Sequence, residues 1–90
     1  MKRLKIRVSG TKHPPYKVVV HPHTTVSDIR THLQLDDDYV LALAATPHRP
    51  FAEGDDMHTL VTNGAKLIAM TSVEAADAFM EHIAFGEGEI

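Results

Sequence analysis

The sequence predicts one α+β domain in which a single helix lies against one face of a small β-sheet. Apolar residues alternate with polar ones over residues 4–8, which is the period of a half-buried strand, and a run rich in β-branched residues follows over residues 16–20. A helix signal follows, and two further strand-like segments come after it. The 90-residue length suffices for one hydrophobic core.

The first two strands are predicted to form a hairpin. The segment from Gly10 to Pro15 supplies turn residues between them, and Pro22 closes the second strand. Each strand would place its apolar residues on one face, namely Leu4, Ile6 and Val8 on the first strand and Tyr16, Val18 and Val20 on the second.

A helix of about ten residues is predicted after Thr25. Thr25 and Asp28 have the spacing of a capping box, with the carboxylate near the positive end of the helix dipole. The apolar stripe is Val26, Ile29 and Leu33, and the outward residues are Arg30, Thr31, His32 and Gln34. We expect the stripe to lie on the sheet.

Two more strands complete the predicted order. The run from Tyr39 to Ala45 is short and apolar, and we interpret it as a buried strand although its alanines would also permit a helix. Residues 46–63 are predicted to be a loop, with Phe51, Leu60 and Val61 in the core. Asn63-Gly64 then turns the chain into a last strand over residues 66–70.

The ordered set of segments resembles the ubiquitin-like (β-grasp) superfamily. The matching segments are LKIRVSG, YKVVVHPHTTVSDI, VLALAAT, PFAEGDD and LVTNGAKLIAM. The last of these is most similar to small bacterial ubiquitin-like proteins, including the accessory proteins of type VII secretion systems. The resemblance implies a ββαββ fold with a mixed sheet and one helix over residues 1–71.

Residues 72–90 are expected to lie outside that domain as an amphipathic helix and a flexible tail. Helical spacing is shown by Val73, Ala76, Phe79, Met80 and Ile83, and either Thr71 or Ser72 could cap the helix.

Composition excludes several classes of function. The net charge of −3 and the isoelectric point near 6.1 disfavour nucleic-acid binding, and the absence of cysteine removes disulfides and thiolate chemistry. The N-terminal segment lacks the unbroken apolar stretch of a signal peptide, and no run is long enough for membrane insertion. We therefore expect a cytoplasmic protein.

No catalytic residue, metal site or cofactor is predicted. The sequence contains no nucleophile-elbow, phosphate-loop or His-Glu-x-x-His motif. His21 and His23 flank Pro22, but a zinc site needs about four convergent ligands, and we expect these histidines to lie on the surface.

The predicted binding surface is apolar. Strand alternation places Ala42, Ile68 and Met70 on the outward face of the sheet. By resemblance, they fall where ubiquitin displays the apolar patch that receptors recognise. Phe79, Met80 and Ile83 complete the candidate set, and the C-terminal helix could instead cover the patch or support self-association.

These observations predict a non-catalytic protein–protein interaction module, either an adaptor or an accessory subunit. The alternative is the precursor of a conjugated modifier. By resemblance that role requires an exposed Gly-Gly end, whereas this chain ends in Gly86-Glu87-Gly88-Glu89-Ile90. Processing to Gly86 or Gly88 would restore a terminal glycine.

Overall fold

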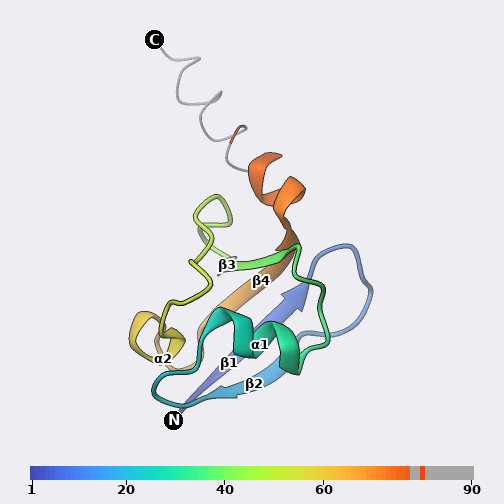
Figure 1. Ribbon diagram of the computed structural model, residues 1–90. Coiled ribbons are helices and arrows are strands. Elements are labelled where there is room, and N and C mark those ends of the chain that lie inside the picture. The colour runs from blue at the N-terminus through green and yellow to red at the C-terminus, as the bar shows by residue number, and fades with distance from the viewer. Residues whose placement is uncertain (78–79, 81–90) are drawn as a thin grey trace.

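A computed structural model describes residues 1–77 and 80 of the chain and shows a four-stranded mixed sheet crossed by a helix (Figure 1). The strands are β1 (Lys2–Val8), β2 (Tyr16–Val20), β3 (Tyr39–Leu43) and β4 (Lys66–Thr71), in the spatial order β2-β1-β4-β3. β1 and β4 are parallel neighbours at the centre, and each pairs antiparallel with an edge strand.

The sheet is apolar on the face that α1 (Val26–His32) covers. The buried strand residues of this core are those that the alternation predicted, namely Leu4, Ile6, Val8, Val18, Val20, Leu41, Leu67 and Ala69. Val26 and Ile29 of α1 lie in the same cluster, each 1% exposed. The predicted hairpin, the strand over residues 39–43 and the seating of the helix are confirmed.

Helix α1 begins as predicted but is shorter. Thr25 accepts a hydrogen bond from the Asp28 backbone N–H, and the Asp28 carboxylate accepts one from the Thr25 N–H, which completes the capping box. The helix ends at His32 because Gln34 adopts a left-handed conformation with φ 58°. The Leu35 N–H then donates to the Arg30 carbonyl, and this closes the last turn.

Arg30 was predicted to face solvent, and that prediction is wrong. Its side chain is only 9% exposed, and its guanidinium contacts the Glu53 carboxylate at 2.7 Å. The same group donates to the Tyr39 carbonyl at 3.3 Å. A long arginine side chain can bury its aliphatic stem while its charged end finds partners, and here it ties α1 to β3 and to the following loop.

The segment between β3 and β4 was predicted to be a loop, but it contains a short helix, α2 (Met57–Leu60), capped by Asp56. Met57 is fully buried, whereas Leu60 is 50% exposed, so the prediction that Leu60 is a core residue is wrong. Val61 is buried and Phe51 packs against the core, as predicted. A helix of one turn is too short to produce a hydrophobic period, so neither its presence nor its inward residue could be predicted.

The central position of Ile29 generates a stability prediction. Ile29→Ala should lower the free energy of unfolding by about 2–5 kcal/mol, because it removes a buried side chain and leaves a cavity between α1 and the sheet. Urea denaturation measures this change. The matched control is His32→Ala on the exposed side of the same helix, which should change stability by less than about 0.5 kcal/mol. Equal losses in the two variants would contradict the seating of α1.

Candidate protein-binding surface

The outward face of β3 and β4 carries a second apolar cluster, separate from the core under α1. Strand register places Ala42 beside Ile68 and Val40 beside Met70. These four residues and Ala75 form the cluster, which is called the outer cluster below. Ala42, Ile68 and Met70 are thus brought together on the face predicted from the alternation.

The helical residues 72–77 continue from the end of β4 (Figure 1, orange), and Ala75 among them packs against part of this face. Ala42 and Met70 are 0% and 3% exposed, and Ala75 at 7% is buried with them. These two sheet residues therefore face away from α1 without facing water. Ile68 remains half-buried. Of the alternatives left open by the sequence, the structure shows that the chain's own helical segment covers part of the patch.

Polar contacts fix the start of this helical segment. Thr71 and Glu74 form a capping box, in which the Thr71 hydroxyl accepts from the Glu74 N–H and the Glu74 carboxylate accepts from the Thr71 N–H, both at 3.3 Å. The Ser72 N–H donates to the Asp38 carbonyl at 2.8 Å, and the Ser72 hydroxyl donates to the Asp38 carboxylate at 2.6 Å. Thr71, not Ser72, is therefore the cap.

Glu74 also joins the segment to the end of β1. The Ser9 hydroxyl donates to its carboxylate at 2.5 Å, and this hydrogen bond, together with those from Thr71, lowers the pKa of Glu74 below its ordinary value of 4.5. The spacing Thr71-x-x-Glu74 is readable in the sequence as a capping box, but the contact with Ser9 depends on the fold.

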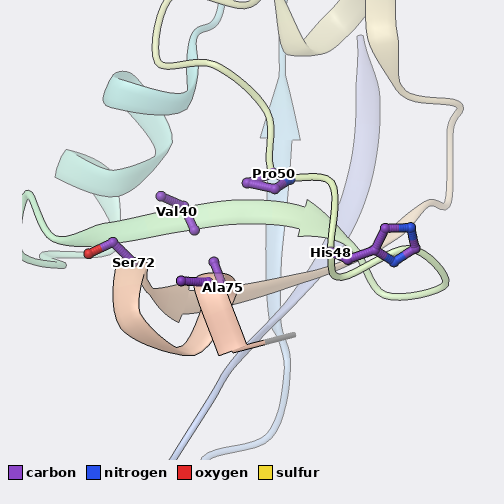
Figure 2. Close-up of a pocket in the computed structure, with 6 residues that line it drawn as sticks. Val40, His48, Pro50, Ser72 and Ala75 are labelled. Carbon is purple, nitrogen blue, oxygen red and sulfur yellow. The ribbon is translucent and has the colours of Figure 1, made fainter. Parts of the chain in front are cut away.

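A shallow hollow lies beside the outer cluster, between the helical segment, β3 and the loop that follows it (Figure 2). Val40 forms its floor, and Ala75 projects toward it from the helical segment. Pro50 and His48 border it from the loop. The covered cluster thus continues into an open depression lined by both sheet and helix.

The remaining predicted site residues are placed only in part. Met80 is 60% exposed, and Val73 on the helical segment 72–77 is 67% exposed. Phe79, Ile83, Gly86 and Gly88 lie outside the described residues. Within residues 1–77 and 80, no group of three or more metal-ligating side chains gathers, and no helix has the length and apolar character to cross a membrane.

Solved structures identify the architecture. An archaeal protein, Caldiarchaeum subterraneum ubiquitin, matches with a TM-score of 0.64 and 24% identity, covering 78% of this chain and 91% of that one. The fold is a ubiquitin-like β-grasp. A second structure, described as a ubiquitin-like protein from the same archaeon, matches with a TM-score of 0.50 and 24% identity over 77% of this chain and 94% of the other.

A third matching structure is that of a protein complex. The crystal structure of ATBAG1 in complex with HSP70 gives a TM-score of 0.61 at 12% identity, covering 99% of this chain and 51% of that one. No protein-family model and no curated protein matches the sequence. The structural similarity shows the β-grasp fold, while the predicted resemblance to bacterial ubiquitin-like proteins stays a prediction.

The polar anchor at Glu74 generates a pH prediction. Since its folded-state pKa is lowered, the contribution of Glu74 to helix docking is complete above its ordinary pKa and is lost as pH falls through the lowered value. Acidification should therefore shift the NMR Cα resonances of residues 72–77 away from helical values.

Glu74→Gln should weaken the docking already at neutral pH and remove this pH dependence. Asp77→Asn is the matched control, because Asp77 is an exposed carboxylate on the same segment, and it should preserve the transition. A transition that persists in Glu74→Gln would show that another group controls the docking.

Proposed function

We propose that the protein is a non-catalytic protein–protein interaction module that works in the cytoplasm as an adaptor or accessory subunit. Its contact surface is the exposed border of the outer cluster together with the C-terminal segment. The observation that carries the proposal is an apolar cluster on the sheet face opposite α1, only partly covered by one short helical segment.

The distribution of exposed apolar side chains supports this location. Val73, on the helical segment that covers Ala42 and Met70, presents a large apolar side chain to solvent, and so does Met80 beyond that segment. Ile68 lies half-buried in the outer cluster. Apolar surface bordered by polar groups is typical of contact sites between proteins, and the border here combines sheet and helix.

The structural neighbours support a protein partner in general terms. Two are ubiquitin-like proteins by name, and the third comes from a complex of ATBAG1 with HSP70. A shared fold does not establish a shared function, so the proposal depends on the apolar surface of this chain. It includes the expectation that the module has no catalytic activity.

Charge substitution in the exposed apolar border tests the proposal. Met80→Asp and Val73→Asp should each reduce recovery of crosslinked partner proteins from the source cells by about tenfold, since a charge at the centre of an apolar contact leaves a desolvated, unpaired group. Quantitative mass spectrometry after crosslinking measures this loss.

The matched control is Leu60→Asp on α2. Leu60 is an apolar residue of similar exposure, at 50%, outside the outer cluster. Its substitution should leave recovery unchanged while thermal unfolding verifies that all variants fold. Equal recovery with Met80→Asp and with Leu60→Asp would refute the proposed surface.

The alternative is a precursor of a conjugated modifier, which is favoured by the match to an archaeal protein named as a ubiquitin. In that case, processing would expose Gly86 or Gly88, and an N-terminally tagged chain should form covalent adducts that survive denaturing electrophoresis. Replacing both glycines by alanine should abolish the adducts, whereas Gly54→Ala, in open space, should not. Adducts that persist without Gly86 and Gly88 would exclude conjugation through either residue.

A further inference from the structure

The other half of the outward sheet face is strongly basic. Strand register places Lys5 on β1 directly between Lys17 on β2 and Lys66 on β4. Arg3 and Arg7 extend from the same face of β1 on either side of Lys5. These five residues form a cross of cations centred on Lys5, which is called the basic cross below.

The basic cross has no internal compensation. Among the described residues, none of its five side chains makes an ion pair or a side-chain hydrogen bond. Like charges directly opposite one another destabilise a sheet, and five of the nine Lys and Arg residues of this net-acidic chain are gathered here. The repulsion among these cations lowers the stability of the fold. A role in binding an acidic ligand would compensate for this loss of stability.

Two hollows flank the centre of the cross. One is bordered by Arg3, Lys5 and Lys17, and the other by Lys5, Arg7 and Lys66. Each hollow is bordered by three cationic side chains, and this arrangement would attract a carboxylate. Alternate residues of an extended chain lie about 6.8 Å apart, matching the spacing from Arg3 to Lys5 to Arg7 along β1.

We propose that the basic cross is a docking surface for an acidic, extended protein segment. Apolar neighbours favour a peptide, because register places Val19 beside Arg3 and Ile68 beside Arg7. Val19 is 45% exposed. On the described outward face of the strands no aromatic side chain is available for base stacking, which disfavours single-stranded nucleic acid.

The proposed interaction function does not specify the chemical character of the partner, whereas the basic cross specifies an acidic, extended segment. It shares with that function the assumption of a protein partner and one bordering residue, Ile68, but the five cations on which it depends lie outside the outer cluster. The test uses a synthetic peptide and not a cellular partner, so either proposal can fail while the other stands.

The probe is a fluorescein-labelled eight-residue peptide in which glutamate alternates with threonine, titrated with the full chain at neutral pH. Fluorescence polarisation should show binding that weakens as sodium chloride is raised, and the glutamine analogue should not bind. Lys5→Gln with Lys17→Gln should weaken binding about three- to tenfold. Lys12→Gln with Arg49→Gln removes two charges outside the basic cross and should leave affinity unchanged.

Thermal unfolding separates binding from a structural role. Because Lys5 stands between two lysines, Lys5→Gln should leave the unfolding midpoint unchanged or raise it, whereas a structural contribution would lower it. Equal weakening by the two double variants, or no peptide binding, would overturn the proposal. So would tighter binding of an oligothymidylate or of phosphatidylserine vesicles, and so would salt-sensitive self-association of the chain that blocks the peptide.

Discussion

The parallel pairing of β1 with β4 is the constraint on which the remaining structure depends. It joins the N-terminal hairpin to the antiparallel pair of β3 and β4, and so makes one sheet of two halves that are far apart in sequence. Parallel neighbours require a crossover connection, and α1 lies within that connection on the face where the core forms. Because α1 covers only this face, the opposite face of the sheet stays open except where the helical residues 72–77 pack against it.

The same pairing divides the outward face into two chemically different halves. Arg7 lies beside Ile68, so the boundary between the basic cross and the outer cluster runs between the two central strands. A shift of one residue in this register would turn the side chains of one strand to the opposite face. Such a shift would expose Ile6, which is buried beside Leu67, and would therefore cost hydrophobic stabilisation. The core thus also fixes the positions of the charged residues on the outward face.

Much of the fold could be predicted because its strands have simple alternation. Leu4, Ile6 and Val8 are buried as that pattern requires, and Thr25 caps α1 as its spacing indicates. The burial of Arg30 could not be predicted, because it depends on Glu53, a residue in a loop whose path has no periodic signal. Four-residue α2 escaped prediction for the same reason.

The candidate site was predicted less completely because each of its halves depends on long-range contacts. Strand alternation identifies Ala42, Ile68 and Met70 as outward, but their cover depends on Ala75, a small residue that any exposed helix could carry. The basic cross could not be predicted from the net charge of the chain, because the acidic residues elsewhere outnumber its five cations.

Only the register shows that Lys17, Lys5 and Lys66 are direct neighbours. Pairing of strands, unlike their existence, is determined by the whole chain, and the charge pattern of a sheet face is therefore a property of the fold. In this protein the apolar half of that face is partly covered by the chain itself, whereas the cationic half is uncompensated within the described residues. The like charges of the cationic half repel one another, and an acidic ligand would reduce this repulsion. The cationic half therefore stands to gain more from a bound partner than the apolar half does.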